Sequence, residues 1–192
     1  MLVRASIFVL LGGLIAVLAI ALLRDDQPPA PKYSSVAAVM PDLDGADPRL
    51  VAIGDQANEL LPGEKPAFEK RLRALRGLPV VVNKWASWCG PCRAEFPMLQ
   101  DTAKKYGDEV AFLGVNPNDA ADDAKAFLAK FPVPYPSYVD PDLEISKLLP
   151  PAGYAPITQF YDEQGKLVYT EPGPFQSTAD LEEKLQRYGL SP

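Results

Sequence analysis

The sequence predicts an α/β fold in which a mixed central sheet carries helices on both faces, preceded by one N-terminal transmembrane helix. Three observations lead to this prediction. Short β-branched segments alternate with segments of helical period through the middle of the chain, which is typical of parallel strands joined by helices. Two further strand-like segments flank a turn signal, which adds an antiparallel pair. An apolar run near the N-terminus approaches the roughly 20 residues that a bilayer-spanning helix needs.

The apolar run extends from Ala5 to Leu23 without a charged residue. Arg4 and the terminal amine precede it, a weak positive-inside bias that favours a cytoplasmic N-terminus. We therefore expect residues 1–24 to form a membrane anchor, with the rest of the chain on the extracytoplasmic side. A cleaved signal peptide is the alternative, because Ala19-Ile20-Ala21 fits a small-x-small cleavage pattern.

The rest of the chain divides into a linker and one domain. Residues 25–48 are rich in Pro, Ala, Ser and Asp and are expected to be a spacer. Residues 49–192 are expected to form the folded domain. Its first part, residues 49–61, has the pattern of a short helix of unassigned role. Residues 65–76 repeat apolar side chains at helical spacing and end before Gly77, a helix stop signal.

The middle and end of the domain supply the sheet. Three consecutive valines begin at Val80, as in a short buried strand. Ser177 opens the last helix with a capping pattern. The expected elements are, in chain order, a strand at 78–85, a helix to 106, a strand at 110–115, a helix at 119–131, a strand at 135–139, a short helix at 142–149, strands at 157–161 and 166–170, and a helix at 177–188.

Composition excludes several classes of function. The chain of 192 residues carries a formal net charge of -6, which disfavours binding to nucleic acid because phosphates need a clustered positive surface. It has two cysteines and no histidine. A Ser-His or Cys-His nucleophile pair is therefore impossible, as is a zinc site of four cysteine and histidine ligands within one chain. We expect no metal and no cofactor.

The two cysteines form the run Trp88-Cys89-Gly90-Pro91-Cys92, which follows a predicted strand and opens a predicted helix. Unpaired N–H groups and the dipole at a helix N-terminus favour an anion, so this position activates Cys89 as a thiolate. Cys92 lies within one helical turn and can attack a mixed disulfide on Cys89. Pro91 is tolerated in a first turn, and Gly90 leaves room for a partner's backbone. A structural disulfide or half of an intermolecular metal site is the less favoured interpretation.

The segment from Val80 to Pro97, VVVNKWASWCGPCRAEFP, resembles the thioredoxin superfamily. Within it, Arg-Ala-Glu-x-Pro after the second cysteine is similar to membrane-anchored, extracytoplasmic thiol–disulfide oxidoreductases of the TlpA, ResA and cytochrome c maturation type. The resemblance covers about residues 65–188 and implies a three-layer thioredoxin-like fold. It also implies that Pro156 is a cis-proline facing the cysteines and that Ala155 presents backbone groups to the substrate. Trp88 is expected to line the exposed substrate surface.

Three polar residues lie near the cysteine motif in the sequence. Asn83 stands where thioredoxin has a buried aspartate, so the acid that assists Cys92 is not given by the resemblance. Glu95 is the nearest acidic candidate, and a solvated glutamate favouring the helix dipole is an equal alternative. Lys84 is unusual in a buried strand and indicates either a sheet edge or a paired carboxylate.

The expected function is dithiol–disulfide exchange that reduces disulfides in partner proteins, among which the resemblance suggests apocytochrome c. A membrane thiol protein would restore the dithiol, because the extracytoplasmic compartment is oxidising. The Gly-Pro pair is similar to thioredoxin, whose potential of about −270 mV lies at the reducing end. The alternatives are a thiol oxidase or isomerase, and a redox-inert module that binds a peptide or metal.

Overall fold

The structure is a computed structural model that describes residues 31–190. The expected membrane anchor, residues 1–24, and the first part of the expected linker lie outside the described residues. Within residues 31–190, no helix is both long and apolar enough to span a bilayer.

A mixed sheet forms the centre of the domain, as the sequence predicts. Its strand order is β1-β4-β3-β2-β5-β6. The first four strands in this order are parallel, whereas β5 pairs antiparallel with β2 and β6 pairs antiparallel with β5. The strands are β1 (Leu60–Leu61), β2 (Val80–Lys84), β3 (Ala111–Pro117), β4 (Ser137–Asp140), β5 (Ile157–Tyr161) and β6 (Leu167–Pro172).

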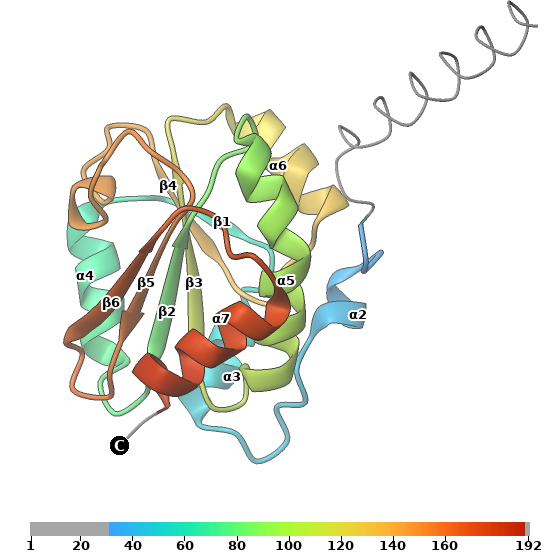
Figure 1. Cartoon of the computed structure of the whole chain (residues 1–192), viewed down its shortest axis with the longest axis vertical. Helices are drawn as coiled ribbons and strands as arrows, with labels where there is room; N and C mark the ends of the chain where they lie inside the picture. Colours follow the sequence, from blue (N-terminus) through green and yellow to red (C-terminus); the bar gives the residue numbers. More distant parts are fainter. Residues whose placement is uncertain (1–30, 191–192) are drawn as a thin grey trace, which may run out of the picture. The chain divides into compact units, whose positions relative to one another are not determined.

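Helices cover both faces of this sheet (Figure 1). Helix α4 and the connection from β4 to β5 lie on one side, and α5, α6 and α7 lie on the other. Right-handed crossovers explain the division, because the chain moves across the sheet in opposite directions from β1 to β2 and from β2 to β4. The helices are α2 (Val36–Val39), α3 (Pro48–Gly54), α4 (Lys65–Ala74), α5 (Gly90–Tyr106), α6 (Ala121–Lys130) and α7 (Thr178–Lys184).

A cluster of aromatic side chains fixes α5 and α6 against the end of β2. Trp85 is fully buried and stacks on Phe127 of α6 with ring centroids 4.9 Å apart. Phe96 of α5 meets the same ring edge-on at 4.7 Å. Such aromatic contacts add to the stabilisation from buried apolar area. They hold the start of α5 in a defined position relative to the strand that precedes it.

The expected linker is wrong for its described part. Helix α2 falls within residues 25–48, and its Val39 is fully buried. Tyr33 donates a hydrogen bond of 2.7 Å to Asp101 of α5. Residues from about 32 onward are therefore part of the domain surface. Composition suggested a spacer because the few apolar residues that anchor this segment are scattered among Pro, Ala and Asp.

Smaller differences concern short elements. The expected helix at 49–61 is α3 followed by the edge strand β1, which exists only through its pairing with β4. The expected helix at 142–149 is reduced to a 3-10 turn, Ser146–Leu148. Helix α7 continues as a π-helical turn, Leu185–Gly189, and its cap is as predicted because Ser177 Oγ accepts the N–H of Asp180.

Candidate active site

The two cysteines lie at the start of α5, where the sequence places them. Cys89 is the N-cap residue of a helix of 17 residues, and Cys92 is in its first turn. Their Cα atoms are 5.3 Å apart and their sulfurs form a disulfide. Cys89 Sγ accepts the backbone N–H of Cys92 at 3.1 Å. In the reduced protein the same N–H and the helix dipole would stabilise a thiolate on Cys89.

The exposure of the two cysteines indicates which sulfur meets a partner's disulfide first. Cys92 is fully buried and Cys89 retains 4% of its surface. A disulfide on another protein reaches Cys89 first, because Cys92 lies beneath it. This order matches the expected roles of Cys89 as the attacking thiol and Cys92 as the resolving thiol.

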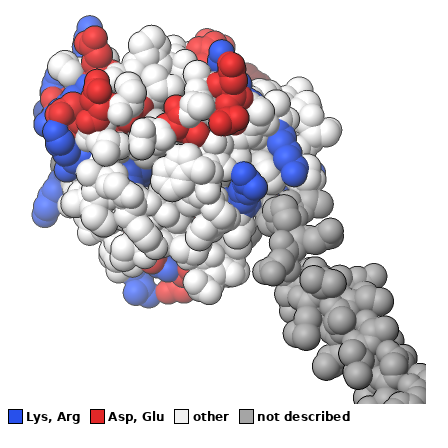
Figure 2. Space-filling model, turned by 90° about the horizontal axis from the view of Figure 1, so that it is seen from above, with Lys and Arg blue, Asp and Glu red and all other residues white. Residues whose placement is uncertain are grey.

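The residues adjacent to Cys89 in the chain are exposed and carry no charge. Trp88 is 57% exposed, and Gly90 and Pro91 are exposed beside it. A Cβ atom added to Gly90 would meet nothing within 4 Å, so this position leaves the approach to Cys89 free. Figure 2 views the end of the molecule at which α5 begins and shows a broad area of uncharged side chains with charged ones at its margins.

The predicted cis-proline loop is also in place. The Ala155–Pro156 bond is cis, and Pro156 directly precedes β5. Ile157 pairs with Lys84, which brings this loop to the same end of the sheet as the residues leading to Cys89. Pro156 is buried and Ala155 is half-buried. The Pro150–Pro151 bond is cis as well.

Glu95 is fully buried in α5, so the interpretation as a solvated glutamate is wrong. Asn83 Nδ2 donates to Glu95 Oε1 at 2.8 Å and to Thr158 Oγ1 at 3.0 Å. Burial raises the pKa of Glu95 from 4.5 to about 8, although hydrogen bonds from Asn83 and the Phe175 backbone lower it. The carboxylate of Glu171 raises it further. Glu95 is therefore mostly protonated at neutral pH and can release a proton slightly above it.

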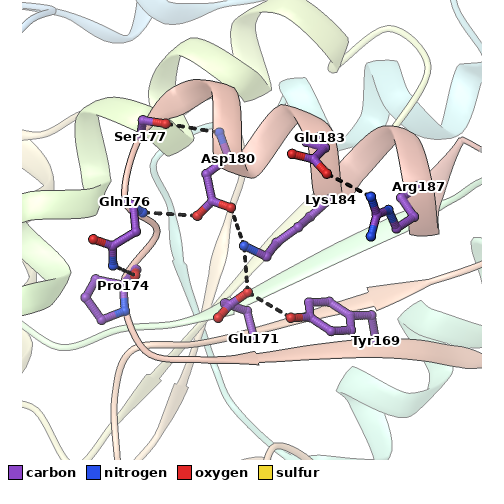
Figure 3. Close-up of polar contacts among 9 residues, drawn as sticks. All are labelled: Tyr169, Glu171, Pro174, Gln176, Ser177, Asp180, Glu183, Lys184 and Arg187. Atoms are coloured by element: carbon purple, nitrogen blue, oxygen red, sulfur yellow. Dashed lines mark hydrogen bonds and ion pairs between the residues drawn. The ribbon is translucent and has the colours of Figure 1, made fainter.

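Glu171 belongs to a surface cluster that joins β6 to α7 (Figure 3). Lys184 contacts the Glu171 carboxylate at 3.0 Å and also pairs with Asp180. Tyr169 donates to Glu171 at 3.0 Å. Glu171 pairs in register with Thr158, so its side chain shares the sheet face on which Asn83 and Glu95 meet. The cluster places the carboxylate of Glu171, which is paired with Lys184, near the buried carboxyl group of Glu95.

Sequence reasoning missed a second polar group beneath Trp88. Asp119 accepts hydrogen bonds from both the backbone N–H and the hydroxyl of Ser87 at 2.6 Å. Arg93 donates to the Ser87 carbonyl at 2.7 Å. The turn between β2 and Cys89 is thereby fixed by Asp119, which follows β3, and by Arg93 of α5. No motif signals this arrangement, because Asp119 is distant in sequence and its position follows from the crossover.

Lys84 differs from both expectations, because it lies in a central strand and pairs with no carboxylate among residues 31–190. Its Nζ instead donates to backbone carbonyls in the connection from β4 to β5. Burial lowers the pKa of Lys84 to about 8, and the more distant Asp140 carboxylate raises it.

Sequence and structure comparisons find relatives of this chain. The model of the Redoxin family matches residues 53–185. The thiol:disulfide interchange protein HelX of Rhodobacter capsulatus is 36% identical over 117 residues, which are 60% of this chain and 63% of that protein. The thiol-disulfide oxidoreductase ResA of Bacillus cereus is 26% identical over 143 residues, 74% of this chain and 82% of its own length. Another curated relative is matched over only 50% of its length.

Solved structures share the same architecture. A crystal structure described as a thiol:disulfide interchange protein DsbE, from Chlorobium tepidum, superposes with a TM-score of 0.54 at 29% identity. The superposition covers 60% of this chain and 83% of that one.

Proposed function

Because this chain belongs to the Redoxin family and is a thiol–disulfide oxidoreductase, we propose that it reduces disulfide bonds in partner proteins outside the cytoplasm. The reducing direction of the reaction is inferred from the modest stabilisation of the Cys89 thiolate. Among the described residues, the hydrogen bond to its sulfur comes from the Cys92 backbone N–H, and Gly90 and Pro91 between the cysteines carry no charge. Strong thiol oxidants instead owe their high potential to a stabilised reduced form.

The reaction is a two-step exchange. The Cys89 thiolate attacks one sulfur of the partner's disulfide; that bond breaks, a mixed disulfide forms, and the leaving thiolate takes up a proton. The Cys92 thiolate then attacks Cys89 Sγ. This step forms the Cys89–Cys92 disulfide and releases the partner's second thiolate. Two electrons have passed to the partner, and a reduced thiol protein must return them before another cycle.

Glu95 is proposed to assist the second step. Cys92 is buried and needs to lose a proton before it attacks, and Glu95 follows it by less than one helical turn. A carboxyl group with a pKa of about 8 exchanges protons readily near neutral pH. Asn83 fixes the carboxyl orientation by its hydrogen bond.

The location and the partners are proposals as well. The uncharged run Ala5–Leu23 supports a membrane tether or a cleaved export signal, and either would place the domain beyond the membrane. The resemblance to cytochrome c maturation proteins supports apocytochrome c as a substrate. A thiol protein of the membrane would then supply electrons, since the compartment is oxidising.

A single trapping experiment tests activity and location together. In the full chain carrying Cys92→Ser, Cys89 still attacks but the mixed disulfide is not resolved, so complexes with partner proteins should accumulate. A membrane-impermeant phosphine reductant added to intact cells should cleave them. The double variant Cys89→Ser, Cys92→Ser is the control. Absence of complexes in the single variant would contradict the activity, and complexes cleaved only after lysis would contradict the location.

A further inference from the structure

Lys84 is a fully buried lysine whose ammonium group is bound entirely by the backbone of one segment. Its Nζ donates to the carbonyls of Leu149 at 2.6 Å, Pro151 at 2.7 Å and Ala152 at 3.4 Å. A lysine ammonium has three donors, and here each finds an acceptor. Burial of a charge is unfavourable unless it is bound in this way, so the arrangement requires the segment to stay in place.

A buried carboxylate holds the other end of the same segment. Asp140, at the end of β4, accepts the backbone N–H groups of Ile145 at 3.0 Å and Ser146 at 2.7 Å. Asp140 is 1% exposed. Two buried groups of opposite charge therefore bind backbone dipoles of residues 140–152, one at each end. Together they fix a connection that has little regular structure of its own.

This connection forms one wall of a cleft that is also lined by Trp88, the residue before Cys89. The cleft measures about 90 Å³ and is lined by Trp88, Pro117, Asn118, Leu143, Ala152, Gly153 and Tyr154. It is much smaller than the roughly 300–1,000 Å³ of a typical cofactor or drug site, and its size suits one side chain. Trp88 and Tyr154 are the most exposed large hydrophobic side chains of the described residues.

The backbone of the cleft adopts the left-handed conformation in two places. Leu143 has a φ of 60° and Asn118 a φ of 43°, both in the left-handed region. For a bulky residue such as leucine this conformation is unfavourable and persists only where the surroundings impose it. Asp140 constrains Leu143, because its carbonyl accepts the Leu143 N–H at 3.3 Å and its carboxylate holds the next turn. Lys84 constrains Tyr154 through Pro151, whose carbonyl accepts both Lys84 Nζ and the Tyr154 N–H at 3.2 Å.

We propose that Lys84 is a positioning residue for substrate selection: it fixes the wall of the cleft between Trp88 and Tyr154, which takes an apolar side chain next to the cysteine of a disulfide-bearing polypeptide. The inference rests on the proposed disulfide reductase function. Apolar and aromatic lining favours such a side chain over a charged one. A rigid wall preserves this preference, because a mobile one would adapt to any residue.

The experiment compares two peptide disulfides that differ only in the residue before the cysteine, leucine in one and serine in the other. With the full chain reduced beforehand, the second-order rate constant for single-turnover reduction should be about tenfold higher for the leucine peptide. In Lys84→Met the preference should fall to about twofold or less because the leucine peptide binds more weakly. The redox potential of the Cys89–Cys92 pair should stay at its wild-type value, because Lys84 binds the connection and not the cysteines.

Lys147→Met is the matched control. Lys147 lies on the same connection but is exposed and pairs with Glu144 at the surface, so the preference should not change. Tyr154→Ala removes an exposed side chain that lines the cleft and should also abolish the preference for the leucine peptide. This variant therefore tests the inference even if Lys84→Met fails to fold.

Three results would overturn the inference: equal rates for both peptides in the wild type, a preserved tenfold preference in a folded Lys84→Met or in Tyr154→Ala, or a shifted redox potential in Lys84→Met. Reduction of neither peptide by the wild type would instead contradict the proposed function itself.

Discussion

At the scale of single residues, two neighbours on β2 serve opposite faces of the sheet. Asn83 turns towards α5 and binds Glu95, whereas Lys84 turns towards the connection from β4 to β5. The sequence identifies both as unusual, since polar residues in a run of valines need partners. It could not identify the partners of Lys84, because they are backbone carbonyls, which every residue has.

The raised pKa of Glu95 predicts how stability depends on pH. Folding raises this pKa from 4.5 to about 8, so the folded state binds the extra proton between these values. Its contribution to stability is complete below the unfolded pKa and is lost as pH rises towards 8, by about 1.4 kcal/mol per pH unit. Urea denaturation of the oxidised protein between pH 5 and 8 should show this loss in the wild type and not in Glu95→Gln.

Glu109→Gln replaces an exposed glutamate and should retain the wild-type pH dependence. Parallel stability curves for the wild type and Glu95→Gln would show that Glu95 ionises without resistance in the folded protein. That outcome would also remove the reason for assigning it a role in proton exchange with Cys92.

At the scale of elements, the long segments were predictable and the short ones were not. Helix α5 begins and ends at the expected residues because a strand, a cysteine N-cap and a glycine bound it. Strand β1 has two residues and is defined by its partner β4, which lies far along the chain. Helix α2 has four residues and is held by contacts with α5. Local periodicity cannot reveal elements that tertiary contacts create.

The cap of α7 offers a test at this scale. Ser177 Oγ accepts the Asp180 N–H at 3.1 Å, and α7 carries the Lys184 that pairs with Glu171 beside the active-site network. Ser177→Ala should lower the free energy of unfolding by about 1 kcal/mol. Thr178→Ala, one residue later and inside the helix, should have no such cost, since alanine favours helix. Equal effects of both changes would contradict the capping role.

At the scale of the whole molecule, the order of the elements determines where the chemistry lies. Alternating strands and helices, followed by an antiparallel pair, leave few arrangements once crossovers are right-handed. The resemblance then places Cys89 and Pro156 at the same end of the sheet, and the structure confirms it. The end of the molecule at which α5 begins has an area of uncharged side chains, with charged side chains at its margins (Figure 2).

The direction of electron flow is a property of the whole molecule, because it compares the stability of the oxidised and reduced proteins. A helix N-terminus stabilises the Cys89 thiolate, but the uncharged Gly90 and Pro91 add nothing to it. The buried Glu95 is mostly protonated at neutral pH and adds no positive charge that would stabilise a thiolate on Cys92. The reduced form therefore gains little stabilisation, which favours a reducing potential.

The equilibrium redox potential of the Cys89–Cys92 pair tests the reducing direction of the exchange most directly. It is measured by equilibration in a dithiothreitol or glutathione series, with Cys89→Ser as the control that has no transition. We predict a reversible two-electron transition at or below about −250 mV, as for a reductase. A value between about −120 and −180 mV would contradict the reducing direction and indicate an oxidase or isomerase.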